Sequence, residues 1–107
     1  MTAISRMGKC WYLVYSKPRQ EKSAVENLVR QKYEIYFPQI QLWRNRSGQR
    51  KLVVEPLFPR YLFVELDWSQ GQGSTIRSTR GVSALVRFGL HPAKVPRSWI
   101  DFLKAGS

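Results

Sequence analysis

The stretch Tyr-Leu-Phe-Val-Glu-Leu at residues 61–66 decides the fold class of this chain. Side chains alternate between the two faces of a β-strand. Here the alternation gives one face with Leu62, Val64 and Leu66 and another with Tyr61, Phe63 and Glu65. A strand that is apolar on both faces is either enclosed in a core or presents one face to a partner. Full cover of both faces is difficult in a chain of 107 residues with few helices, so the stretch predicts a sheet with one exposed apolar face, and enclosure in an ordinary core is the alternative.

The segments before this strand predict alternating strands and a helix. Residues 11–15 (Trp-Tyr-Leu-Val-Tyr) and 33–37 are aromatic and β-branched runs, which favour strands. Between them, apolar residues recur at helical spacing, which predicts an amphipathic helix over 19–32. Residues 40–42 and 52–54 flank a polar stretch that contains Ser47-Gly48, and this pattern predicts a β-hairpin with a basic tip.

The segments after this strand predict smaller elements. Gly71 and Gly73 indicate a loop that leads into a short polar helix or turn near 75–79, and a strand is expected over 82–88. Residues 91–96 are expected to form a loop, from which Pro96 opens a final helix. We therefore predict one α+β domain over 11–104, with an antiparallel sheet of about four strands flanked by helices, after a flexible leader at 1–10.

The charge of the chain indicates a polyanionic partner. The 107 residues include 18 Lys and Arg but only 7 Asp and Glu, for a net charge of +11. Such a charge favours nucleic acid through phosphate contacts, although a ribosome-associated basic protein is an alternative. The basic residues form three clusters within structured segments, at 44–51, 17–22 and 77–80.

Several classes of function are disfavoured by composition. Cys10 is the only cysteine and His91 the only histidine, so an internal disulfide and a zinc site built from these residues are excluded. The chain has no apolar run long enough to span a membrane and no signal peptide, so we expect a cytoplasmic protein. No nucleophile stands beside a base and no glycine-rich phosphate loop is present, so we expect neither an enzyme nor a cofactor.

Two candidate surfaces follow from the same patterns. We expect an exposed apolar patch that suits a partner helix or coiled coil, formed by Tyr61, Phe63, Phe88, Ile100 and Leu103. We expect a phosphate-binding surface from Lys17, Arg19 and Gln20 at a helix N-terminus, and from Arg77, Ser78, Thr79 and Arg80. An RNA-binding module that stacks bases on Tyr61 and Phe63 is the alternative.

Three motifs, in order, resemble the N-terminal domain of NusG-type transcription elongation factors. The first is residues 11–15 followed by Lys-Pro-Arg-Gln-Glu at 17–21, and the second is Glu-Pro-Leu-Phe-Pro-Arg-Tyr-Leu-Phe-Val at 55–64. The third is Thr-Arg-Gly-Val at 79–82 with Val-Arg-Phe-Gly at 86–89. The opening and the Pro-Leu-Phe-Pro run are more similar to the RfaH branch, the specialised antiterminators, than to housekeeping NusG.

The resemblance implies a transcription elongation and antitermination factor. It would bind RNA polymerase at the β′ clamp helices through the apolar patch, touch the β-subunit gate loop, and suppress pausing and termination. RfaH-like members also read the non-template DNA strand, and the matching positions here are Lys17, Gln20 and residues 77–80. The resemblance further implies a monomer whose small C-terminal β-barrel domain would follow a linker near Ser107.

Two departures from the RfaH pattern concern the polymerase and DNA contacts. Where RfaH relatives carry His-Thr-Thr for the gate loop, this chain has Gln72, Gly73 and Ser74. Pro18 and Ser23 replace basic residues of some DNA-reading relatives, so a different DNA sequence preference is expected.

Overall fold

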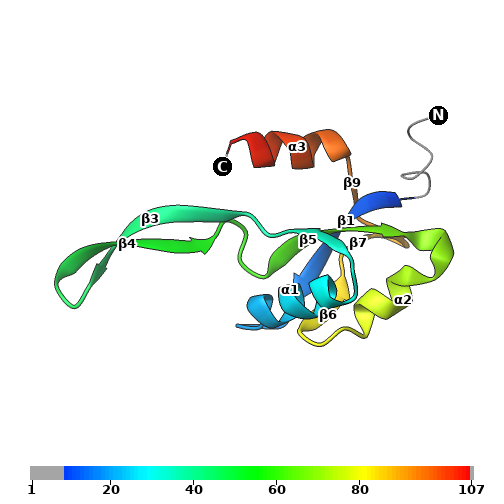
Figure 1. Cartoon of the computed structure of the whole chain (residues 1–107), viewed down its shortest axis with the longest axis horizontal. Helices are drawn as coiled ribbons and strands as arrows, with labels where there is room; N and C mark the ends of the chain where they lie inside the picture. Colours follow the sequence, from blue (N-terminus) through cyan, green and yellow to red (C-terminus); the bar gives the residue numbers. More distant parts are fainter. Residues whose placement is uncertain (1–8, 107) are drawn as a thin grey trace.

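The computed structural model describes residues 9–106, and its elements confirm the α+β class (Figure 1). The elements in chain order are β1 (Lys9–Ser16), α1 (Glu21–Arg30), β2 (Glu34–Tyr36), β3 (Gln39–Arg46), β4 (Gln49–Pro56), β5 (Tyr61–Asp67), the 3-10 turn η2 (Trp68–Gln70), α2 (Gln72–Arg77), β6 (Val82–Leu85), β7 (Arg87–Phe88), β8 (His91–Pro92), β9 (Lys94–Val95) and α3 (Arg97–Ala105).

The main sheet is antiparallel and is built around β1 and β5. Its strand order is β2-β5-β1-β6, and β9 also pairs with β1, so the sheet has five strands where about four were predicted. β1 and β5 pair along their whole length, from Lys9 opposite Asp67 to Tyr15 opposite Tyr61. The strand predicted at 61–66 is therefore confirmed, and it lies in the interior of the sheet.

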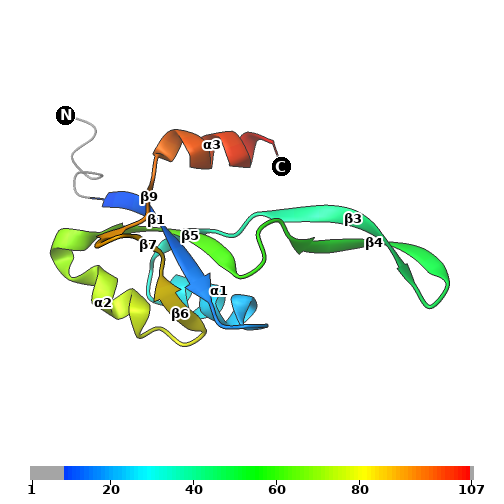
Figure 2. The same cartoon turned by 180° about the vertical axis from the view of Figure 1, so that it is seen from behind.

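Helices cover both faces of this sheet. α1 and α2 lie on one face, where Leu28 and Ile76 pack with Val14, Val64 and other buried apolar residues. α3 lies on the opposite face, where Ile100 packs against Trp11 and Phe63. Figures 1 and 2 show α3 on one side of the sheet and α1 with α2 on the other. The alternation along β5 thus separates two cores.

α1 is shorter than the predicted helix over 19–32, and backbone conformation explains both ends. Arg19 and Lys32 have φ values of 60° and 74°, in the left-handed region. A right-handed helix cannot include such residues. The helix therefore runs only from Glu21 to Arg30.

The β3–β4 hairpin is much longer than predicted. Its strands pair continuously from Gln39 opposite Pro56 to Arg46 opposite Gln49, so the polar stretch expected as a loop forms paired strands. The turn is only Ser47 and Gly48, with φ values of 53° and 78°, as a type I′ turn requires. The hairpin extends away from the helices and gives the molecule its 54 Å long axis (Figure 1).

Other predicted boundaries are also corrected. The leader predicted over 1–10 is wrong at its end, because Lys9 and Cys10 belong to β1; residues 1–8 lie outside the described part. The strand predicted over 82–88 is broken after Leu85, and Phe88 pairs with His91 in a separate two-stranded sheet. The loop predicted over 91–96 contains β8 and β9.

Residues 9–106 contain neither a membrane-spanning helix nor a metal-binding cluster of side chains. None of the helices in this range is long and apolar enough to cross a membrane. No group of three His, Cys, Asp or Glu side chains in the same range could hold a metal ion. Cys10 is half-buried in β1, where it packs against the core beneath α1 and α2.

Candidate binding surfaces

An apolar groove opens between α3 and the face of the sheet that α3 covers. Its volume is about 960 Å³, and among the described residues Lys94 is the one charged residue in its lining. Phe58, Tyr61 and Phe88 line it from the strands and the turn before β5, and Trp99 and Phe102 line it from α3. Phe88, Trp99 and Phe102 are 72%, 64% and 78% exposed, so most of each side chain takes no part in packing the core. A contiguous apolar surface of this kind marks an interaction site.

α3 is held over the sheet at both ends. At its start, Arg97 forms an ion pair with Glu65 on β5, with the Nη2 and Oε2 atoms 2.6 Å apart. Near its end, the Lys104 ammonium lies 5.5 Å from the Trp11 ring centroid and 5.6 Å from that of Tyr36. Both distances suit cation–π attraction.

The apolar residues of α3 divide between the core and the groove. Ile100 is fully buried against the sheet, and Leu103 is half-buried between the core and the groove. Trp99 precedes Ile100 and Phe102 precedes Leu103, and both aromatic side chains remain exposed. The face of a helix that packs on a sheet is too narrow to bury all four of these residues.

The structure changes the composition of the predicted apolar patch. Tyr61, Phe63, Phe88 and Leu103 do line the groove together. However, Phe63 is only 7% exposed and Ile100 is 0% exposed, so these two are core residues and the prediction that they are exposed is wrong. Phe63 lies beneath α3, and Ile100 is the residue by which α3 packs onto the sheet; strand alternation alone does not predict this contact.

Sequence reasoning misses three aromatic residues of the groove: Phe58, Trp99 and Phe102. Helical spacing groups Trp99 with Ile100 and Leu103 in an apolar stripe of the last helix, and the flanking prolines place Phe58 in the extended entry into β5. A signal is present, because Trp99, Phe102 and Leu103 together with Ile100 exceed what one buried helix stripe can hold.

The two predicted basic clusters come together on the other side of the sheet. The Lys17 amide donates a hydrogen bond of 2.8 Å to the Gly81 carbonyl. Gly81 lies so close to α1 that an added Cβ would stand 2.6 Å from the Ala24 nitrogen. The segment before α1 and the segment before β6 are therefore in contact, although they lie far apart in the sequence.

Six of the seven residues expected to bind DNA are exposed at this junction, and we name them the basic patch: Lys17, Arg19, Gln20, Arg77, Ser78 and Arg80. The prediction fails for Thr79, which is buried. Its hydroxyl donates to the Thr75 carbonyl at 2.9 Å and accepts from Gln31 Nε2 at 2.8 Å. The first bond is local to the end of α2, and the second ties that end to Gln31, the residue that follows α1, so this hydroxyl is occupied within the fold.

Residues 72–74 form the first turn of α2, so the loop predicted there is wrong. Gln72 Oε1 accepts a hydrogen bond from the Asp67 amide at 2.8 Å, which closes the turn after β5. Gly73 is buried, and an added Cβ would lie 2.5 Å from the Trp68 ring. Ser74 alone of the three is exposed.

The hairpin carries the third basic cluster, and its one carboxylate, that of Glu55, pairs with two arginines of this cluster. Arg44 donates two hydrogen bonds to Glu55, of 3.1 and 2.7 Å, and Arg46 lies 3.6 Å from the same carboxylate. The hydrogen bond from Arg44 lowers the pKa of Glu55 and raises the pKa of Arg44. Both shifts favour the charged form of the group concerned.

Fold and surfaces together define a small α+β domain, with an apolar groove on one side of a sheet and a basic patch on the other. Residues 9–104 match the family model described as transcription termination factor NusG. That match spans most of the chain, and this protein belongs to the NusG family.

Individual relatives agree with this assignment. The transcription termination/antitermination protein NusG of Thermus thermophilus is 28% identical over 97 residues, covering 77% of this chain and 53% of the relative. A solved structure of domain interaction in Thermotoga maritima NusG has a TM-score of 0.66 and 24% identity, covering 91% of this chain and 56% of that one. The latter similarity supports the fold, and this chain spans about half the length of the relatives it matches.

Proposed function

We propose that this domain binds RNA polymerase through the apolar groove and contacts the non-template DNA strand through the basic patch, and so suppresses pausing and termination. The observation that carries the proposal is the groove, where three large aromatic side chains stay exposed beside a well-packed core. The proposal extends the family assignment to partners that the family name alone does not give.

The shape of the groove suits a helical partner. It is bounded by a helix on one side and by strand aromatics on the other, and its lining is almost entirely apolar. An amphipathic helix docks into such a groove by its apolar face. The tip of the β′ clamp helices, a helical hairpin, is the occupant we propose, with a smaller contact of exposed Ser74 to the β-subunit gate loop.

The basic patch suits an extended nucleic acid strand. It lies across the sheet from the groove, so both surfaces can be occupied at once. Lys17, Arg19, Arg77 and Arg80 supply cations, and Gln20 and Ser78 supply groups that can contact base edges. An RfaH-like, sequence-directed mode of recruitment is part of this proposal.

Burial disfavours the alternative of an RNA module that stacks bases on Tyr61 and Phe63. Phe63 lies beneath α3 and against Trp11 and Val95, so a base cannot reach its ring unless α3 moves away. The polymerase-docking proposal needs no such movement.

Binding to core RNA polymerase tests the groove. Fluorescence anisotropy of the labelled chain should show binding that an isolated clamp-helix peptide competes away. Phe102→Ala should weaken this binding at least tenfold without lowering the melting temperature, because the Phe102 side chain is mostly exposed. Val29→Ala on α1, which removes an exposed apolar side chain from the other side of the sheet, is the matched control. Wild-type binding by Phe102→Ala would contradict the proposal.

Recruitment to an elongation complex tests the basic patch separately. Arg80→Ala should reduce binding that depends on the non-template strand while leaving clamp-helix peptide binding unchanged. Equal loss of both activities in a folded variant would contradict the division of the two surfaces.

A further inference from the structure

The β3–β4 hairpin presents a side-chain surface that the proposed polymerase docking does not use. Trp43 on β3 is 59% exposed and lies opposite Leu52 on β4, which is also exposed. Val54 lies opposite Gln41 and is exposed as well. A ribbon that projects from the domain offers no core in which an indole could be buried. The presence of a tryptophan there therefore needs another explanation.

The two faces of the hairpin differ in charge. By register, one face carries Trp43 with these residues: Gln41, Asn45, Arg50, Leu52 and Val54. The opposite face carries Arg44, Arg46, Lys51 and Glu55, and the only carboxylate of residues 39–56 is therefore held there by two arginines. The Trp43 face has a cation and amides but no carboxylate, within a hairpin of net charge +3.

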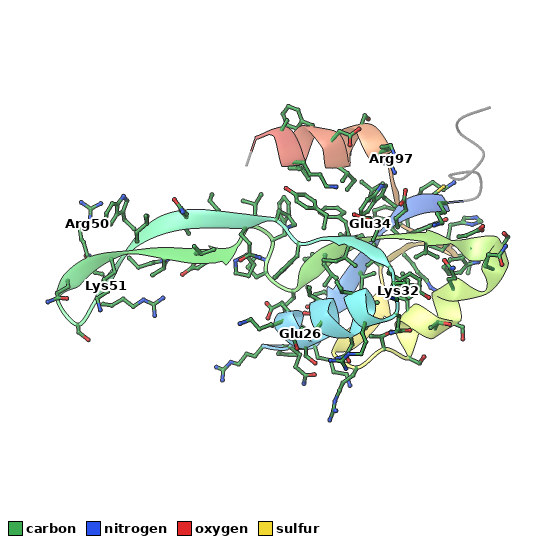
Figure 3. All side chains as sticks on the ribbon, viewed as in Figure 1. Glu26, Lys32, Glu34, Arg50, Lys51 and Arg97 are labelled. Atoms are coloured by element: carbon green, nitrogen blue, oxygen red, sulfur yellow. The ribbon has the colours of Figure 1, made fainter. Side chains whose placement is uncertain are left out.

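Arg50 and Trp43 form a stacked pair on this face. The Arg50 guanidinium carbon lies 5.0 Å from the centroid of the Trp43 ring. Arg50 and Lys51 stand at the far end of the hairpin, away from the helices (Figure 3). An exposed indole beside an arginine plane is a platform on which unstacked bases can stack.

We propose that the Trp43 face of the hairpin binds single-stranded RNA. Bases would stack on the Trp43–Arg50 pair, and the amides of Gln41 and Asn45 would contact base edges and 2′-hydroxyl groups. Arg44, Arg46 and Lys51 would meet the phosphates from the other face. A duplex is not the ligand, since its bases are already stacked and offer no free face to Trp43. The inference does not depend on polymerase docking.

Anisotropy of a fluorescein-labelled oligouridylate with the whole chain tests this inference. Trp43→Ala should weaken binding about tenfold, as loss of one base-stacking ring does. Trp43→Leu keeps apolar packing against Leu52 but has no ring, so it should lose as much. Trp43→Phe keeps a ring and should stay within about threefold of the wild type. Arg50→Ala should also weaken binding.

Matched controls separate stacking from charge and from folding. Trp99→Ala removes an equally exposed indole from the groove, and Arg30→Ala removes an exposed arginine from α1; both should bind the oligouridylate like the wild type. The melting temperature of every hairpin variant should be unchanged, since the hairpin lies outside both cores.

Oligodeoxyuridylate and a blunt RNA duplex of the same length complete the test, and both should bind more weakly than the oligouridylate. Three outcomes would each overturn the proposal. These are wild-type RNA binding by Trp43→Ala, equal losses in Arg50→Ala and Arg30→Ala, and deoxy or duplex probes bound as tightly as the single-stranded RNA.

Discussion

The two faces of the main sheet are both apolar, yet only one is closed. On the first face, Leu28 of α1, Ile76 of α2 and Leu66 of β5 are completely buried between the helices and the sheet. On the second face, Ile100 of α3 is equally buried, but Phe88 and Phe102 beside it are mostly exposed. The first face has two helices over it and the second has one, and the uncovered area is where we propose that a partner binds.

This difference separates residues that stabilise the fold from residues that bind. On the closed face, each apolar side chain is packed on all sides, so its loss leaves a cavity. On the open face, an exposed aromatic side chain contributes little to the stability of the folded state. Its burial can instead stabilise a complex with a partner. Four pairs of variants probe this contrast.

The largest effect is expected on the closed face. Leu66→Ala should lower the free energy of unfolding by about 2–5 kcal/mol, because it leaves a cavity among fully buried neighbours. Phe102→Ala, although it removes a larger side chain, should lower it by less than about 0.5 kcal/mol. Urea denaturation of both proteins measures this, and a large loss in Phe102→Ala would remove the distinction between the faces.

A close backbone contact gives the next effect. Gly81 has a φ of 92° and has no space for a Cβ against α1. Gly81→Ala should cost about 2 kcal/mol, since strain and a steric clash act together. Gly89→Ala is the control, because Gly89 has a φ of 64° but open space around it, so strain acts alone. Equal melting temperatures for the two variants would show that the contact with α1 is unimportant.

Loss of the ion pair at the start of α3 tests how strongly this pair holds α3 against the sheet. Arg97→Ala should cost about 0.5 kcal/mol, since the arginine is well exposed and such pairs contribute little. Partial release of α3 should also increase hydrogen exchange at the amides of α3 more than at those of α1. Arg87→Ala removes the same charge from an exposed position and should change neither quantity.

The hairpin, which is open on both faces, gives the smallest effect. Arg44 is the main cause of the lowered pKa of Glu55 in the folded state. Their pairing therefore stabilises the folded state at pH values above the ordinary carboxyl pKa, and this stabilisation is lost as the pH falls through the lowered pKa. In Arg44→Ala, the Glu55 carboxyl should titrate at a higher pH in an NMR experiment. Arg46→Ala should give a smaller rise, and an unchanged titration in Arg44→Ala would contradict this assignment.

The sequence predicts the elements in which apolar residues recur with a regular period. It does not predict which side chains are buried by an element that lies far away in the sequence. Alternation at 61–66 correctly separates the two faces of β5, because period two is a property of the strand itself. The same pattern does not reveal that α3 lies over Phe63, since that depends on a helix much later in the chain. The position of the groove is therefore predicted, but two of the residues assigned to the exposed patch, Phe63 and Ile100, are buried.

Polar segments are the other source of error. The hairpin strands carry few apolar residues, since neither face packs on a core, and their polar run resembles a loop. Sequence reasoning assigns Thr79 to DNA because hydroxyls suit phosphates, but its hydrogen bonds with α1 and α2 depend on tertiary contact. The helix at 72–77 is too short to show a helical period.

The contact between Gly73 and Trp68 couples two positions in evolution. The Trp68 ring stands where a side chain at 73 would begin, and its other neighbour is the buried Tyr12 ring at 5.8 Å. A mutation that introduces any side chain at 73 must displace this indole, unless residue 68 becomes smaller first. Replacement of Gly73 among descendants of this chain is therefore expected only in lineages where position 68 has also changed.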